Sequence, residues 1–432
     1  MLLLALVLAA SPQCVRARGC NERAGRVERL PTPPPDFSFA PVSGRGMTAA
    51  CACTSPTGAK GETLTFTRAS SAYCTKGDWN SGIVAGDMVL CTANQPRVMP
   101  GGDGTGGSGL MVEKAVTNTV SFPNAFDNAA WNSTSSGVAD PTVTANAGTA
   151  PDNTATAERF QFNAVTSAQY TIRRQPATAC TTSATNVGSI YIKGNAGAGG
   201  TLHLIMADSA WYCTACTYVA DTWTRCEATR ALNGVAGTLA FGNGAGLCAT
   251  GQAQGAHDVL VWGAQCEVST SAQPYATSLI VSADGTPAPR AAETASFTVP
   301  ARFTVNSLSL TRETPWTKSN STNDIALYAA YGAGSIQFYN ATNGLDYCDQ
   351  TNVSTNYGYS NIEATSSRLV CRVKSADGAF TATENGTVMT LDGPNSIASE
   401  ASLIEIGQSG GASQTNGVIK DVCIDRHRNR CN

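Results

Sequence analysis

Short strand-like segments recur along most of this chain, and their spacing limits more than any other feature what the chain can fold into. Between residues 123 and 280 they follow one another at intervals of about 8–12 residues, which is typical of a β-sandwich. The residues between them favour turns over long helices. We therefore predict an all-β fold. The clearest segments are residues 158–162, 169–172, 188–193, 201–206 and 258–262.

The composition agrees with short strands and many turns. Asp, Glu, Lys and Arg make up 14% of the chain, whereas an ordinary globular domain contains about 25%. Thr packs well on pleated surfaces, and Gly and Asn supply the positive φ angles of tight turns. The net charge of −3 and the lack of any Lys/Arg run argue against nucleic acid as a partner, because phosphate binding needs a clustered cationic surface.

The chain begins with an apolar run over residues 1–10. The run is much shorter than the roughly 20 residues that span a bilayer, so we predict no membrane span. It fits the core of a secretory signal, although the positively charged segment that normally precedes such a core is missing. We predict a leader over residues 1–12 with cleavage after Ala9 or Ala10. The alternative is a mis-assigned start codon.

The sixteen cysteines fall into three even groups. Six lie at positions 14–91, six at 180–266 and four at 348–431. Even numbers within each group predict disulfides, and disulfides persist in oxidising surroundings. Together with the signal-like start, this predicts a secreted, extracellular or cell-surface protein.

The pairing of these cysteines stays mostly open, since six cysteines allow about 15 connectivities and four allow about 3. We predict the pairs Cys348 with Cys371 and Cys423 with Cys431. The spacing of Cys213 and Cys216 would also suit a redox or metal site, but the surrounding sequence lacks a βαβ pattern and a second pair at recognised spacing. Structural disulfides are therefore favoured there.

Composition changes suggest the domain borders. Residues 13–58 show no sustained period and include a stiff Pro-rich stretch, so we expect a linker or stalk. Residues 59–122 form a short β module, 123–286 a jelly-roll sandwich, and 287–432 a second sandwich. The second border follows from the Pro-Ala-Pro sequence at 287–289.

Residues 258–267, Asp-Val-Leu-Val-Trp-Gly-Ala-Gln-Cys-Glu, are followed by Pro274 and Tyr275. This stretch resembles the strings that close a jelly roll of the carbohydrate-binding-module type in tailed-phage fibre and spike proteins and their bacterial relatives. Cys266 stands where an aliphatic residue is usual. The resemblance implies a domain whose Trp262 packs in the core.

The segment 62–131 resembles a short module of phage head-spike and tail-fibre proteins. One departure is Val116, where that family usually carries Arg. Residues 290–292, Arg-Ala-Ala, resemble the link that follows the jelly roll in the same proteins. The matching positions are Phe66, Arg68, Ala69, Ser70, Ser71, Ala72, Pro96, Arg97, Gly109, Leu110, Val112, Glu113, Thr117, Asn118 and the stretch from Asn124 to Trp131.

The last 140 residues also resemble a known sandwich. Glu384-Asn-Gly-Thr387 is a strong two-residue hairpin signal, and residues 417–424 form a closing strand. This order resembles a concanavalin-like or laminin-G-like sandwich. The expected fold is thus a tandem of β-sandwiches, a jelly roll plus a concanavalin-like sandwich, with a disulfide-rich N-terminal segment.

Two motifs formally suggest enzymes. Residues 104–109 match GxGxxG without the flanking strand and helix that a dinucleotide site requires. Residues 407–411 match GxSxG, but a turn follows where a nucleophile elbow enters a helix. Polysaccharide hydrolysis is the more serious alternative, since a pair of carboxylates suffices, yet Glu313, Glu384 and Glu405 are scattered. We expect no catalytic residues.

Sugar binding needs less: an aromatic ring for the apolar sugar face and a few polar partners for hydroxyls. Trp211, Tyr212 and Trp223 lie in what the sequence indicates is a loop-rich stretch, where ligand contacts concentrate. They are the candidate ligand-binding residues. We expect no cofactor, although jelly rolls of this kind can hold a structural calcium ion.

The resemblances imply a non-catalytic, exported or virion-associated adhesin or fibre-like protein that binds a polysaccharide or cell-surface glycan. A homotrimer is an option, because the related modules are often trimeric. Two alternatives stay open: a purely structural phage tail-fibre or filament subunit, and a polysaccharide hydrolase. The leader and cysteines favour the secreted form over a virion location.

Overall fold

The computed structural model of the chain describes nine ranges up to residue 305 and the strands that follow them. Every described secondary-structure element is a β-strand, which confirms the all-β prediction. The described ranges are 37–39, 51–55, 62–75, 82–100, 108–234, 237–248, 252–268, 276–280, 285–305, 307–313, 324–331, 334–340, 345–352, 355–362, 366–373, 380–384, 387–388, 390–391, 399–406 and 417–425.

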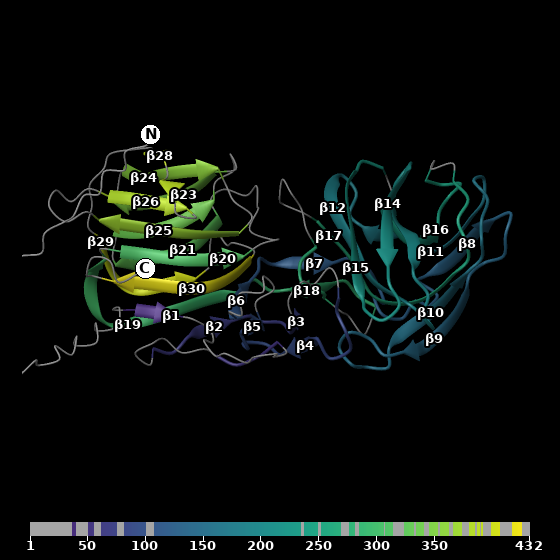
Figure 1. Ribbon diagram of the computed structural model, residues 1–432, viewed down its shortest axis with the longest axis horizontal. Helices are drawn as coiled ribbons and strands as arrows, with labels where there is room; N and C mark the ends of the chain where they lie inside the picture. The colour runs from purple at the N-terminus through teal and green to yellow at the C-terminus, as the bar shows by residue number, and fades with distance from the viewer. Residues whose placement is uncertain are drawn as a thin grey trace, which may run out of the picture. The chain divides into compact units, whose positions relative to one another are not determined.

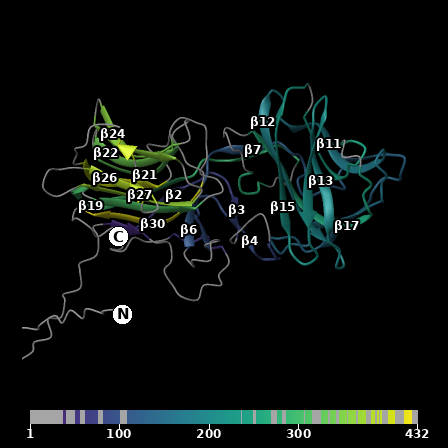
Figure 2. The same cartoon turned by 45° about the horizontal axis from the view of Figure 1, so that its top comes forward.

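The middle of the chain forms a sandwich of two five-stranded antiparallel sheets (Figures 1 and 2). One sheet has the order β15-β12-β17-β10-β9 and the other β14-β13-β16-β11-β8. The strands are β8 (Asn132–Ser136), β9 (Thr142–Gly148), β10 (Ala157–Phe162), β11 (Tyr170–Cys180), β12 (Ala184–Gly194), β13 (Gly200–Ala207), β14 (Trp211–Tyr218), β15 (Thr224–Leu232), β16 (Gly237–Asn243) and β17 (His257–Val268).

An apolar core fills this sandwich. Successive side chains of a strand point to opposite faces of its sheet. In β12, for example, Ile190 and Ile192 point into the core, whereas Tyr191 points to the outer face. Aromatic rings dominate one part of the core: Phe160 lies 5.0 Å from Phe241 and 5.8 Å from Phe126 between ring centroids. The disulfide between Cys180 of β11 and Cys266 of β17 links the two sheets through this core.

Most of the other described strands form two eight-stranded antiparallel sheets. One has the order β2-β19-β29-β21-β22-β23-β24-β28; the other has the order β27-β26-β25-β20-β30-β6-β5, with β1 also pairing with β30. The strands are β1 (Phe37–Phe39), β2 (Thr65–Thr67), β5 (Arg97–Pro100), β6 (Ser108–Val112), β19 (Thr294–Val305), β20 (Ser307–Glu313), β21 (Asp324–Tyr331), β22 (Gly334–Asn340), β23 (Leu345–Asn352), β24 (Thr355–Ile362), β25 (Ser366–Val373), β26 (Phe380–Glu384), β27 (Thr387–Val388), β28 (Thr390–Leu391), β29 (Ser399–Ile406) and β30 (Gly417–Asp425). The tandem-sandwich fold is confirmed.

Strands from the N-terminal part of the chain extend these C-terminal sheets. β2 pairs with β19, β6 pairs with β30, and β1, inside the predicted linker, also pairs with β30. Two short hairpin-like pairs complete the segment: β3 (Ala72–Thr75) with β4 (Met88–Cys91), and β7 (Val116–Asn118) with β18 (Ala288–Arg290). The borders at 59, 123 and 287 stay predictions, but strand pairing joins residues on opposite sides of each of them.

The disulfides follow the predicted even grouping. All six cysteines of the middle group pair within it, as Cys180–Cys266, Cys213–Cys248 and Cys216–Cys226. In the N-terminal group the described bonds are Cys51–Cys74 and Cys53–Cys91. Cys213 and Cys216 therefore take separate partners. These bonds indicate folding in an oxidising compartment.

Several predictions fall on residues outside the described ranges. Cys423 is disulfide-bonded, but its predicted partner Cys431 is outside them, and the side chains of Cys348 and Cys371 are not described. The same holds for the glycine-rich motifs at 104–107 and 407–411. The predicted hairpin at 384–387 is described on both sides of its turn, where Glu384 pairs with Thr387.

Candidate functional site

The two outer faces of the jelly-roll sandwich differ. On the sheet β15-β12-β17-β10-β9, outward side chains pack under the N-terminal segment, and we call this surface the covered face. Backbone hydrogen bonds of 2.7 and 3.3 Å join Ile83 to Trp223. Tyr73 contacts Trp262 edge to face, with ring centroids 5.7 Å apart. The residues of the covered face are Tyr191, Trp223, Leu260 and Trp262, packed with Tyr73, Ile83 and Met88.

The outer face of the sheet β14-β13-β16-β11-β8 stays partly accessible. Its centre is a small buried cluster of Ile172, Ile205 and Ala240. The Cys213–Cys248 disulfide fixes the turn that covers this centre. Around the centre lies the open rim, which consists of half-buried Tyr170 and Trp211 and exposed Ala215 and Thr217.

The open rim contains one of the three candidate binding residues. Trp211 and Tyr212 begin β14 instead of lying in a loop, so that part of the prediction is wrong. Because successive side chains of a strand point to opposite faces, Trp211 faces the rim, whereas Tyr212 packs against the sandwich core. The guanidinium of Arg230 lies 3.8 Å from the centroid of the Tyr212 ring, so this ring is partly covered.

The third candidate, Trp223, is fully buried on the covered face. Trp223 does lie in the connection between β14 and β15, but a ligand cannot reach its ring, because its backbone pairs with Ile83 and its ring packs among apolar residues of the N-terminal segment. Lys193 Nζ lies 5.2 Å from the Trp223 ring centroid. The sequence thus indicates three candidates, and the structure leaves Trp211 as the accessible one on an open sheet face.

A tight turn fixes the start of β14 and with it the position of Trp211. Asp208 accepts backbone hydrogen bonds from Ala210 at 3.0 Å, Asn233 at 2.8 Å and Gly234 at 3.1 Å. These backbone donors lower the pKa of Asp208 to about 2, because they stabilise the carboxylate. Asp208 therefore holds the turn that precedes the half-buried Trp211.

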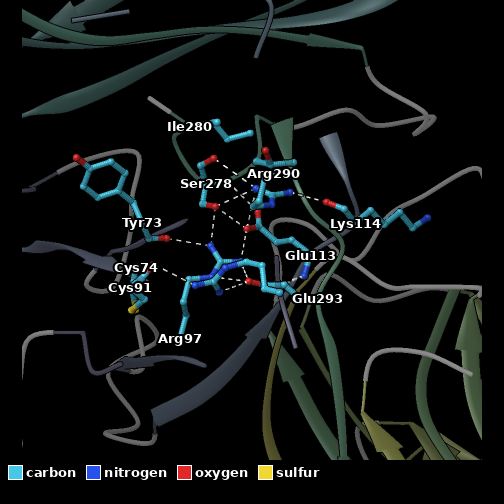
Figure 3. Close-up of polar contacts among 12 residues, drawn as sticks. Tyr73, Cys74, Cys91, Arg97, Glu113, Lys114, Ser278, Ile280, Arg290 and Glu293 are labelled. Carbon is cyan, nitrogen blue, oxygen red and sulfur yellow. Dashed lines mark hydrogen bonds and ion pairs between the residues drawn. The ribbon is translucent and has the colours of Figure 1, made fainter. Parts of the chain in front are cut away.

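The residues of the phage-like signature gather elsewhere, in a buried ion network (Figure 3). Arg97 lies 2.5 Å from Glu113 and 2.7 Å from Glu293, and all three side chains are fully buried. Arg68 forms a further 2.7 Å pair with Glu293, and Arg290 lies 3.0 Å from Glu113. The network thereby joins the segments around residues 68, 97, 113 and 290.

Hydrogen bonds extend this network to the end of the jelly roll. Ser278 Oγ donates to Glu113 at 2.6 Å and accepts from Arg97 at 2.6 Å. Gln265 accepts from the backbone N–H of Ile280 at 2.9 Å. Burial alone would raise the pKa of Glu113, but Arg290 and Arg97 hold it at about 2, so it is ionised. The Arg and Glu side chains of this network are fully buried, so these residues of the signature form a structural junction.

Another buried acid lies inside the jelly roll. Glu158 of β10 is 2% exposed, and burial raises its pKa to about 8, with Asp127 beside it. A raised pKa is a common property of a general acid, but this carboxyl group is shielded from solvent. Glu158 accordingly adds little to the hydrolase alternative.

The structure shows no metal centre in the ranges it describes. No three His, Cys, Asp or Glu side chains of those ranges come together as metal ligands. The described ranges also contain no helix with the length and apolar character needed to cross a membrane. The calcium ion mentioned above stays an option without a named site.

Comparisons with known proteins find distant similarity in fold. A Clostridium thermocellum xylanase 10B fragment with CBM22-1 and GH10 modules is 16% identical over 39% of this chain and 30% of its own, with a TM-score of 0.24. The CBM22-1–CBM22-2 tandem of Paenibacillus barcinonensis Xyn10C is 9% identical over 73% of this chain and 99% of its own, with a TM-score of 0.26.

Domains LG4-5 of the mouse laminin α1 chain are 10% identical over 62% of this chain and 89% of theirs, with a TM-score of 0.21. No protein-family description matches the chain, and no curated protein matches it significantly. These similarities are too distant to assign a ligand or an activity.

Proposed function

We propose that this protein is a non-catalytic, exported adhesin or fibre-like protein that binds glycans through the open rim of its jelly roll. The observation that carries the proposal is the half-buried Trp211 ring on the open rim. The outer face of the other sheet of the sandwich, the covered face, is packed under the N-terminal segment. An indole ring packs against the apolar face of a sugar, and neighbouring polar groups can bind hydroxyls.

Two further features support this assignment. The resemblance of residues 258–267 to the closing string of carbohydrate-binding jelly rolls points to the same ligand class. The disulfides place the protein in an oxidising compartment, where glycans of a cell surface or an extracellular polysaccharide would be met. Secretion is favoured over a virion location for the same reason.

A glycan array probed with the purified, oxidised full-length chain tests the proposal. We expect saturable binding to a subset of glycans, and Trp211→Ala should lower the affinity for them about tenfold, the loss of roughly 1.4 kcal/mol. Val388→Ala is the control, because Val388 is exposed on β27, which belongs to another sheet than the open rim. Binding to no glycan would contradict the proposal and favour a purely structural subunit. Release of reducing sugars would favour the hydrolase.

A further inference from the structure

One of the three disulfides in the jelly-roll sandwich lies near its surface. Both cysteines of the Cys213–Cys248 bond are half-buried. Every cysteine of the other two bonds in this sandwich is 6% exposed or less. A thiol reduces a disulfide by direct attack on one of its sulfur atoms, so access to the sulfur limits the rate. The Cys213–Cys248 bond is therefore the one of the three that an external thiol reaches most easily.

The turn at residues 244–248, which carries Cys248, has few other attachments to the sheet. Two of its backbone hydrogen bonds are internal, because the N–H groups of its last two residues donate to Gly244 O at 2.9 and 2.8 Å. Among the described hydrogen bonds of this turn, one leaves it, from Gly246 N to Gln169 O at 2.9 Å. A single hydrogen bond contributes little to stability in water. The disulfide is therefore the main tie between this turn and β14.

The same turn covers the apolar centre of the outer sheet face. All three residues of the small buried cluster there are 0% exposed, and Leu247 and the disulfide pack against them. The packing is close at the base of the turn, where a Cβ atom on Gly244 would lie 2.6 Å from Cys248 Sγ and 3.0 Å from Ile205 Cδ1. If the turn moves away, part of the apolar cluster becomes exposed to solvent.

The immediate neighbours of the bond do not repel an anionic reductant. On the outer face of β14, Cys213 lies between Trp211 and Ala215, and its cross-strand partner is Ile205. None of these three neighbours carries a negative charge. The attacking form of a thiol is the thiolate, which can thus approach the bond without like-charge repulsion from them.

We propose that the Cys213–Cys248 disulfide is a redox-sensitive latch, which a small external thiol opens. The thiolate attacks one sulfur and forms a mixed disulfide, while the other cysteine leaves as a thiolate and takes up a proton. A second thiol resolves the mixed disulfide, so that one protein disulfide and two thiols give two cysteine thiols and one small disulfide. The turn at 244–248 then moves away and exposes the apolar cluster. This latch does not depend on glycan binding at the open rim.

Limited reduction of the folded, full-length chain with glutathione, followed by alkylation and peptide mass spectrometry, tests the first step. We expect Cys213 and Cys248 to be alkylated roughly tenfold faster than the cysteines of the two buried bonds, because a buried bond reacts only after the sandwich opens. The two buried bonds are matched controls within the same sandwich. Equal rates, or faster alkylation at a buried bond, would overturn the proposal.

Hydrogen exchange tests the second step, with the oxidised wild type as the reference. After selective reduction, the amides of residues 246–248 should exchange roughly tenfold faster, because their turn has lost its tie to β14. The double variant Cys213→Ser with Cys248→Ser should show the same fast exchange without any reductant. Slow exchange of this turn in both forms would overturn the proposal, since the turn would then stay closed without its disulfide.

Discussion

The two outer faces of the jelly roll have the same strand geometry but opposite surroundings. The covered face carries large aromatic residues, and the N-terminal segment, which contains the buried Arg97–Glu113 pair, packs over it. The open rim has two aromatic residues, Tyr170 and Trp211, and both are only half-buried. The difference shows that aromatic content alone does not locate a binding surface. What matters is which face the rest of the chain leaves uncovered.

The largest effect is expected for the ion network beside the covered face. Arg97→Ala leaves Glu113 and Glu293 buried without their shared partner, which should cost about 3–5 kcal/mol of unfolding free energy. Arg159→Ala is the matched control, because the side chains of its 2.5 Å ion pair with Asp258 are 35% and 29% exposed, and solvent-screened pairs contribute little to stability. Denaturant unfolding measures the free energy of unfolding of both variants. Equal losses would show that the buried ion pairs contribute no more to stability than the exposed one.

The two tryptophans give the next comparison. Trp223→Ala should cost about 3–5 kcal/mol, because it opens a cavity in a fully packed region. Trp211→Ala should cost much less, about 1 kcal/mol, because the ring is only half-buried. Urea titrations of the two variants in parallel provide the test. If Trp211→Ala proved the more destabilising, the distinction between covered face and open rim would fail.

Acid should weaken the covered face through Glu113. Its pKa is lowered from 4.5 to about 2 in the folded protein. The ionised Glu113 therefore contributes its whole stabilisation at pH values above its pKa in the unfolded chain. That contribution is lost as the pH falls from about 4.5 through 2, and it amounts to roughly 3 kcal/mol. Glu113→Gln should flatten the stability profile over this range. A profile with the same slope in both proteins would show that another group controls acid unfolding.

A smaller loss of unfolding free energy is expected when the Cys213–Cys248 disulfide beside the open rim is removed. This bond joins two cysteines that are 35 residues apart in the sequence. Replacing both cysteines by Ser should cost about 2–3 kcal/mol, near the middle of the usual range for a disulfide. Hydrogen exchange should increase mainly in residues 244–248, which the bond fixes over β14. Uniform exchange across the sandwich would contradict a local role.

Sequence patterns predicted the strands well where apolar and polar residues alternate. Residues 158–162 and 258–262 lie in β10 and β17 as expected. β14 was missed because its inward positions carry Tyr, Thr and Cys where a strand core usually has aliphatic residues. The even cysteine groups predicted disulfides within each group, but the pairing partners depend on strand positions that spacing does not specify.

The buried ion network was harder to predict, because its members are distant in sequence. Arg68 and Glu293 are 225 residues apart and still form a 2.7 Å hydrogen bond. Their meeting depends on how the N-terminal strands extend the C-terminal sheets. In the sequence, Trp211 and Trp223 both lie between stronger strand signals, so the pattern does not distinguish them. Only the packing of the segment around Ile83 separates a buried ring from an accessible one.

Glycan affinity of the two tryptophan positions is the most direct test of the central claim. On any glycan that binds the wild type, isothermal titration with Trp211→Ala and Trp223→Phe should separate the two faces. We predict about a tenfold loss for Trp211→Ala and an unchanged affinity for folded Trp223→Phe. Glycan binding at the open rim would be contradicted if Trp211→Ala bound the glycan as tightly as the wild type does. A loss of glycan affinity in Trp223→Phe alone would contradict it as well.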